Sequence, residues 1–85
     1  MSRSATHFLL TAFLFCVAAP SFADFAAGRI AYKAANYPVA AREFQAAAEA
    51  GEARAQNDLG VLYERGLGVK QDYAQAAQWY GRAAN

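Results

Sequence analysis

Apolar residues recur at helical spacing from residue 24 to residue 85, and no stretch alternates apolar and polar residues with a period of two. The spacing predicts four helices, which extend from about residue 24 to 35, from 38 to 50, from 52 to 65 and from 72 to 84. Their buried faces are expected to be Phe25, Gly28, Tyr32 and Ala35; Tyr37, Ala41, Phe44 and Ala48; Ala55, Leu59, Leu62 and Tyr63; and Tyr73, Ala77, Tyr80 and Ala84.

Residues suited to helix ends separate these four segments. Asp24 and Asp72 are predicted N-caps, and Gln75 follows Asp72 at the spacing of a capping box. Asn36 is expected to end the first helix in the left-handed conformation. The other boundary residues are Pro38, at the start of the second helix, and Gly51 and Gly66, at the ends of the second and third.

The second and fourth predicted helices carry matching residues at an offset of 36 positions, and Gly28 of the first helix aligns with Gly60 of the third at an offset of 32. A repeat of this length is typical of a helical solenoid. The sequence therefore predicts an all-α fold, an α-solenoid of two antiparallel helical hairpins. The matched pairs are Tyr37/Tyr73, Ala41/Ala77, Phe44/Tyr80, Ala47/Ala83 and Ala48/Ala84.

Residues 55–84 contain the pattern A-x-x-x-L-G-x-x-Y-x-x-G-x-G-V-x-x-D, followed by A-x-x-W-Y-x-x-A-A. This segment resembles a Sel1-like repeat, a relative of the tetratricopeptide repeat with a longer inter-helix loop that contains glycine. Residues 24–51 resemble a shorter, tetratricopeptide-like hairpin. The resemblance implies a solenoid that contacts other proteins, often as an adaptor in bacterial envelope or signalling pathways. The expected organisation is a signal peptide over 1–23, a tetratricopeptide-like hairpin over 24–51 and a Sel1-like repeat over 52–85.

The start of the chain has the parts of an export signal. A polar segment that carries Arg3 precedes an apolar run over residues 8–19, and Ser21 and Ala23 place small side chains at the −3 and −1 positions of a cleavage site. Cleavage is expected after Ala23. We therefore expect an exported protein, periplasmic or secreted, in a bacterium.

Other interpretations of this segment stay open. A membrane anchor needs about 20 apolar residues, whereas residues 8–22 are fifteen with Pro20 among them. Cleavage after Ala19 also satisfies the small-residue rule, but Pro20 would then follow the cut bond. Acylation of Cys16 as in a lipoprotein would need a small residue before it, and Phe15 stands there. No stable membrane span is expected after signal cleavage.

The composition of residues 24–85 argues against catalysis. This segment has no Ser, Thr, Cys, His or Met, and thus lacks the usual nucleophiles and the usual general base. Its seven carboxylates are scattered, and zinc's favoured ligands are absent, so no catalytic residue, cofactor or metal is expected. Its seven basic and seven acidic residues cancel, so a nucleic-acid partner is not expected.

The expected partner is another protein or peptide, bound on the concave side of the solenoid. The polar face of the third helix lies opposite its apolar residues, and charged residues of the first helix would extend it. The alternative is a solvated polar face with no partner. The predicted contact residues are Arg54, Asn57, Val61 and Glu64 on the third helix, and Arg29 and Lys33 on the first.

Trp79 is a further candidate for a partner contact, since buried aromatic residues dominate many interfaces. The alternative is that its indole packs against a neighbouring hairpin of the stack. Two hairpins make a small solenoid, and the surface of the last helix around Trp79 is expected to be exposed. The sequence thus permits two functions, an adaptor in the cell envelope or a truncated or self-assembling solenoid fragment that associates through its C-terminal helix.

Overall fold

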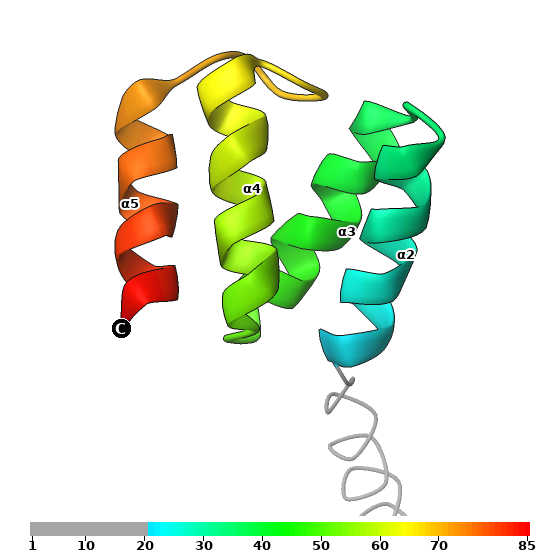
Figure 1. Cartoon of the computed structure of the whole chain (residues 1–85), viewed down its shortest axis with the longest axis horizontal. Coiled ribbons are helices and arrows are strands. Elements are labelled where there is room, and N and C mark those ends of the chain that lie inside the picture. Colours follow the sequence, from blue (N-terminus) through cyan, green and yellow to red (C-terminus); the bar gives the residue numbers. More distant parts are fainter. Residues whose placement is uncertain (1–20) are drawn as a thin grey trace, which may run out of the picture.

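The computed structural model describes residues 21–85, with side chains from residue 24. Four helices follow one another in this part of the chain, α2 (Ser21–Lys33), α3 (Tyr37–Glu49), α4 (Ala53–Arg65) and α5 (Tyr73–Ala84), and it contains no strand. Each helix packs against the next, and the four form two antiparallel hairpins with α2 and α5 at opposite ends of the row (Figure 1). The prediction of an all-helical, two-hairpin fold is confirmed for these residues. Residues 1–20, most of the predicted signal peptide, lie outside the described part.

Most predicted helix ends are confirmed. The Asp72 side chain accepts a hydrogen bond from the Gln75 backbone N–H at the start of α5. Gly66 ends α4 in the left-handed conformation with φ of 68°, and its N–H donates to the carbonyl of Leu62. Pro38 lies in the first turn of α3, where a missing N–H costs nothing.

Three predicted details are wrong. The chain is already helical at Ser21, so Asp24 lies in the first turn of α2, where its charge suits the helix dipole, and not at the cap. Ala35, with φ of 60°, takes the left-handed conformation expected of Asn36. Only one of the two hydrogen bonds of the predicted capping box forms. The Asp72 N–H donates to the carbonyl of Tyr63 at 2.9 Å and is therefore not available to the Gln75 side chain.

The core runs through the middle of the row. Its largest fully buried side chains are Phe44 of α3 and Leu59 and Leu62 of α4. Alanines fill the space between these side chains, so the helices approach closely. One buried polar side chain joins the two hairpins, since Gln56 Nε2 of α4 donates to the carbonyl oxygen of Ala48 of α3 at 3.1 Å. The other buried apolar residues are Ala31, Ala40, Ala41, Ala47, Ala48, Ala55, Ala76 and Trp79.

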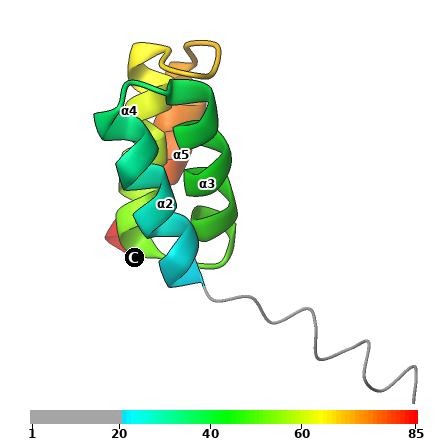
Figure 2. The same ribbon diagram turned by 90° about the vertical axis from the view of Figure 1, so that its right-hand side faces the viewer.

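The buried face of α5 differs from the predicted one. Ala76 and Trp79 are buried, whereas Tyr73, Ala77 and Ala84 are exposed. The prediction transferred the buried positions of α3 to α5, but the two helices have different surroundings. In the described part of the chain, α3 packs against both α2 and α4, whereas α5 packs chiefly against α4. Figure 2 looks along the row, with α2 and α3 in front of α4 and α5.

Both hairpins use the same close contact between a glycine and an aromatic ring. A Cβ atom on Gly28 would lie 2.5 Å from Cδ1 of Phe44, and one on Gly60 would lie 2.7 Å from Cε1 of Tyr80. The absent side chains allow each ring to lie directly against the helix backbone. These two contacts place Gly28 at the position of Gly60, and Phe44 at the position of Tyr80, in successive repeats.

The loop between α4 and α5 packs back on the first hairpin. Gly68 has φ of 74°, and a Cβ atom there would collide with the carbonyl group of Tyr37 at the start of α3. Leu67 and Val69 on either side are partly buried against the core. The long loop therefore helps to hold the two hairpins together.

Candidate functional site

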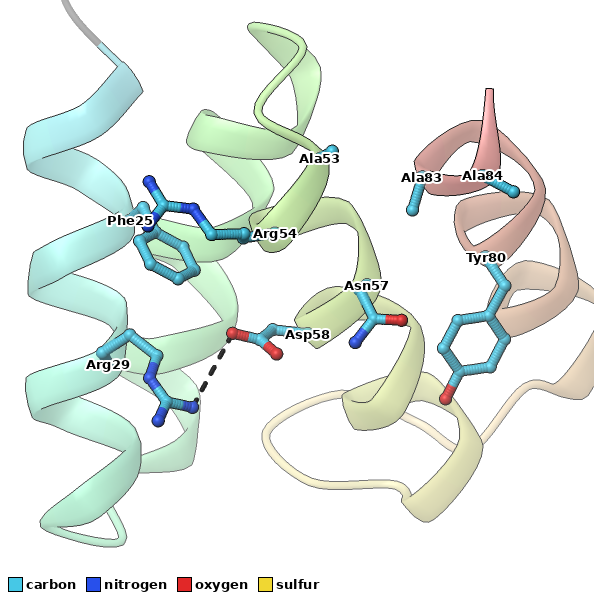
Figure 3. Close-up of a pocket in the computed structure, with 9 residues that line it drawn as sticks. All are labelled: Phe25, Arg29, Ala53, Arg54, Asn57, Asp58, Tyr80, Ala83 and Ala84. Carbon is cyan, nitrogen blue, oxygen red and sulfur yellow. Dashed lines mark ion pairs between the residues drawn. The ribbon is translucent and has the colours of Figure 1, made fainter.

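An open groove of about 580 Å³ runs across α4 between α2 and α5. In the close-up of this groove, side chains of α2 and α5 lie on either side of those of α4 (Figure 3). The sequence predicted a binding face on the first and third helices, and the groove adds the C-terminal half of α5 to it. The lining residues are Phe25, Arg29, Ala53, Arg54, Asn57, Asp58, Tyr80, Ala83 and Ala84.

Two contacts join α2 to α4 along one wall of the groove. The Arg29 guanidinium of α2 forms an ion pair with Asp58 of α4, with 3.8 Å between Nη1 and Oδ2 (Figure 3). The Arg54 guanidinium of α4 lies over the Phe25 ring of α2, 4.4 Å from the ring centre. A cation over an aromatic face is attracted by the ring quadrupole. This wall therefore presents charged groups that are already held in place.

Glu52 holds Arg54 from the other side. Its carboxylate accepts hydrogen bonds from the Arg54 side chain, the shorter at 3.0 Å from Nη2, and one from the Arg54 backbone N–H at 3.2 Å. These hydrogen bonds lower the pKa of the Glu52 carboxyl. Arg54 thus combines an ion pair with an aromatic contact, which limits the conformations of a long side chain.

Asp58 is the acidic group of the groove. Burial raises the pKa of its carboxyl, and the charges of Arg29 and Arg54 act against this rise. The pairing with Arg29 is longer than a hydrogen bond, so it compensates only part of the lost hydration. A hydrogen-bond donor on a bound partner would stabilise the charged form of Asp58.

The opposite wall is formed by Tyr80 and the small side chains of Ala83 and Ala84. The Tyr80 hydroxyl donates to the Glu64 carboxylate at 2.6 Å, which links α5 to α4. Burial and this hydrogen bond raise the pKa of Tyr80 to about 12. The hydroxyl therefore stays neutral through the physiological range, and the ring forms a fixed apolar surface beside the groove.

Asn57 lies between the two walls (Figure 3). Its side chain is exposed, and among the described residues its amide makes no hydrogen bond. An amide offers both a donor and an acceptor. Asn57 can therefore bond to the backbone of an extended peptide.

A second, smaller cavity of about 180 Å³ adjoins the first, and Arg29 and Asp58 line both. It adds Val61 and the aromatic side chains of Tyr32 and Phe44. The shared residues make the two cavities parts of one surface on the α2–α4 side of the molecule.

The predicted contact residues fall into three groups. Arg29, Arg54 and Asn57 line the groove, and Val61 lines the adjoining cavity. The Glu64 side chain is bonded to Tyr80, and Lys33 is exposed outside the lining of both cavities.

The structure places Trp79 in the core, which agrees with the packing alternative and not with a partner contact. It is 7% exposed and belongs to the core, with the Arg82 guanidinium 4.4 Å from the centre of its ring. The indole is therefore covered by the described residues, and α5 exposes Tyr73, Ala77 and Ala84 instead. The surface around Trp79 does not present the ring to a partner.

The sequence analysis missed Phe25, Asp58 and Tyr80 as groove residues. The first and last were assigned to buried faces, and each is only partly buried. Asp58 follows Asn57 directly and lies four residues after Arg54. This i+4 spacing on one helix face is the one signal in the sequence that could have indicated Asp58 as a groove residue.

Within residues 21–85, no group of three or more His, Cys, Asp or Glu gathers in a way that could hold a metal ion. The helices of this same segment are too short or too polar to cross a membrane.

Residues 53–85 match the family model described as Sel1 repeat, which covers α4, the long loop and α5. Comparisons with curated proteins and with solved structures gave no match. The likeness of residues 24–51 to a tetratricopeptide-like hairpin stays a prediction. Sel1 repeats are generally non-catalytic and typically bind other proteins. The segment from residue 53 to residue 85 is therefore a Sel1 repeat, as its resemblance in sequence predicted.

Proposed function

We propose that this chain is an exported adaptor of the bacterial cell envelope, which holds a segment of another protein in the groove between α2, α4 and α5. The observation that carries the proposal is the exposed amide of Asn57, which lies between two preformed walls and bonds to none of residues 21–85. Peptide recognition commonly combines side-chain hydrogen bonds to the peptide backbone with apolar surface beside them.

The composition of the groove supports a protein ligand. It offers aromatic surface from Phe25 and Tyr80, two guanidinium groups and one carboxylate. Tyrosine and arginine are enriched among the residues that dominate binding energy. Because Arg29 and Arg54 are already held by neighbours, little conformational entropy is lost when a partner binds them.

The lack of nucleophiles supports binding over catalysis. None of the residues that line the groove is a Ser, Thr, Cys or His, and its one carboxylate, Asp58, is paired with Arg29. General acid–base or nucleophilic chemistry would need such groups within reach of a substrate. The groove therefore suits recognition of a polypeptide.

Export is supported by the first 23 residues, with their polar start, short apolar run and small residues before position 24. The test is to express the full chain in a Gram-negative host and to sequence the N-terminus of the protein from the periplasmic fraction. The proposal expects a mature chain that begins at Asp24. A chain that keeps Met1 and stays in the cytoplasm would refute export and leave the groove to be tested separately.

The groove is tested by a photo-crosslinking amino acid placed at position 57, with the same residue at Arg42 as a control. Arg42 is exposed on α3 and lines neither cavity. The proposal expects a discrete adduct with one protein from position 57 and none from position 42. Identical adducts from both positions, or none from position 57, would refute the assignment of the groove.

A further inference from the structure

The two large apolar side chains that the described residues expose lie at opposite ends of the row of helices. Ile30 of α2 is 71% exposed and Tyr73 of α5 is 68% exposed. The row ends in α2 on one side and in α5 on the other (Figure 1). Each end therefore presents apolar surface that no neighbouring helix of the described chain covers.

The glycine–aromatic contacts define which residues of the two hairpins are equivalent. The pair Gly28 and Gly60 shows that a residue of α2 is equivalent to the residue of α4 that lies 32 positions later. The pair Phe44 and Tyr80 shows that a residue of α3 is equivalent to the residue of α5 that lies 36 positions later. With these offsets, each end of the molecule can be compared with the interface between α3 and α4 inside it.

The outer face of α5 is equivalent to the face of α3 that α4 covers. Ala77 and Ala84 of α5 are exposed, whereas their equivalents in α3, Ala41 and Ala48, are buried. The bond from Gln56 to the carbonyl of Ala48 shows that α4 lies against this part of α3. The outer face of α5 thus has the shape that accepts a helix like α4.

The outer face of α2 is equivalent to the face of α4 that packs on the first hairpin. Ile30 corresponds to Leu62 and Ala27 to Leu59, and both leucines are fully buried. In α2 the same positions are uncovered, with Ile30 exposed and Ala27 partly exposed. The outer face of α2 thus carries an apolar surface like the one that α4 lays on α3.

The apolar positions of these two faces match those that meet between α3 and α4, with Asp24 in place of Gln56. We propose that copies of this chain stack head to tail, with α2 of one copy on the outer face of α5 of the next. Residues 24–85 carry no net charge, so copies do not repel one another at long range. Such an interface does not use the same patch on both copies and therefore extends into a row longer than a dimer.

The α3–α4 interface also predicts which residues meet. The bond between Gln56 and Ala48 fixes one level at which the antiparallel helices α3 and α4 meet. Ala41 lies seven residues before Ala48 on α3, and Leu62 lies six residues after Gln56 on α4. Because both helices rise about 1.5 Å per residue, Ala41 and Leu62 lie at about the same level. Their equivalents at the two ends are Ala77 and Ile30. The stack therefore brings Ile30 of one copy next to Ala77 of another.

The test uses cysteine pairs in the full chain, expressed and processed in its host, in a Cys16→Ser background that removes the single native thiol. Chains that carry Ile30→Cys, chains that carry Ala77→Cys and chains that carry both are treated with a short thiol-to-thiol crosslinker over a concentration series. Ala46→Cys, at an exposed position in the middle of α3, is the matched control. Circular dichroism checks that each variant keeps its helices.

The proposal expects dimers only from a mixture of the two single variants, and a ladder of higher oligomers from the double variant. Dimers from Ile30→Cys alone or from Ala77→Cys alone would show a symmetric contact and overturn the head-to-tail arrangement. A double variant that crosslinks no more than Ala46→Cys would overturn self-association. Neither result bears on the adduct formed from position 57.

Discussion

Gly60 of α4 lies directly under the ring of Tyr80 of α5, and a Cβ atom at position 60 would be 2.7 Å from Cε1 of that ring. The same relationship recurs between Gly28 and Phe44 in the first hairpin. The ring of Tyr80 also forms one wall of the groove, and its hydroxyl is bonded to Glu64. The packing of the repeat and the shape of the groove thus depend on the same contact.

Gly60→Ala is expected to lower the free energy of unfolding by about 1–3 kcal/mol, because the added methyl group displaces the Tyr80 ring and such overpacking outweighs the better helix propensity of alanine. Urea unfolding measures the change. Gly81→Ala is the matched control, since Gly81 is also in a helix but has nothing within 4 Å of an added Cβ. That control is expected to stabilise the chain by up to about 1 kcal/mol, and equal effects of the two substitutions would refute the contact.

Ala35→Gly is expected to raise the free energy of unfolding by roughly 0.5–1 kcal/mol, because Ala35 has φ of 60° and a left-handed conformation is unfavourable for any residue with a Cβ atom. Thermal unfolding of the two chains measures the difference. Ala46→Gly, in the exposed interior of α3, is expected to have the opposite sign and to cost about 1 kcal/mol. Destabilisation by Ala35→Gly would contradict the assigned backbone conformation.

Gln56→Met is expected to cost about 0.5–1.5 kcal/mol, because the buried carbonyl of Ala48 loses the hydrogen bond that it accepts from Gln56 and keeps the one that it accepts from the Gly51 N–H. Chemical denaturation measures the loss. Gln45→Met is the control, since Gln45 bonds near solvent to Glu49 of its own helix, and its replacement is expected to change stability by less than about 0.5 kcal/mol. If both variants are equally stable, the bond between the hairpins contributes nothing.

Tyr80 is expected to titrate at a higher pH than an unperturbed tyrosine. Its pKa is about 12 in the folded chain, whereas an unperturbed tyrosine ionises near pH 10. The folded state holds this proton more tightly than the unfolded state, so the stabilisation is complete below about pH 10 and is lost as the pH rises toward 12. Absorbance at about 295 nm against pH should show one late transition that Tyr80→Phe removes and Tyr73→Phe keeps. Loss of the late transition in Tyr73→Phe would contradict this assignment.

The sequence predicted helix positions well where a boundary depends on local chemistry. Asp72, Gly66 and Pro38 act through their own side chains or backbone, and the structure places each at the expected helix end. The left-handed residue at the end of α2 was missed, because Asn36 has the higher intrinsic preference and the adjacent Ala35 takes that conformation. Nothing in the spacing of the apolar residues distinguishes the two.

The buried face of α5 and the lining of the groove could not be predicted from spacing, because both depend on which helices lie beside which. Ala77 matches Ala41 in sequence, but among the helices of residues 21–85 only Ala41 has a second neighbour. Asp58 became a groove residue through its contact with Arg29, which comes from another helix. Helical periodicity indicates the polar face of one helix and not its partners across a groove.

The central claim is that the groove around Asn57 binds a segment of another protein. The most direct measurement is the affinity of the protein captured from position 57 for the unmodified chain and for the variant Arg54→Ala/Asn57→Ala, by calorimetry on purified proteins. We expect the double substitution to weaken binding at least about tenfold, which corresponds to about 1.4 kcal/mol, and Arg42→Ala to leave the affinity unchanged. Equal affinities for the chain and the double variant would contradict it.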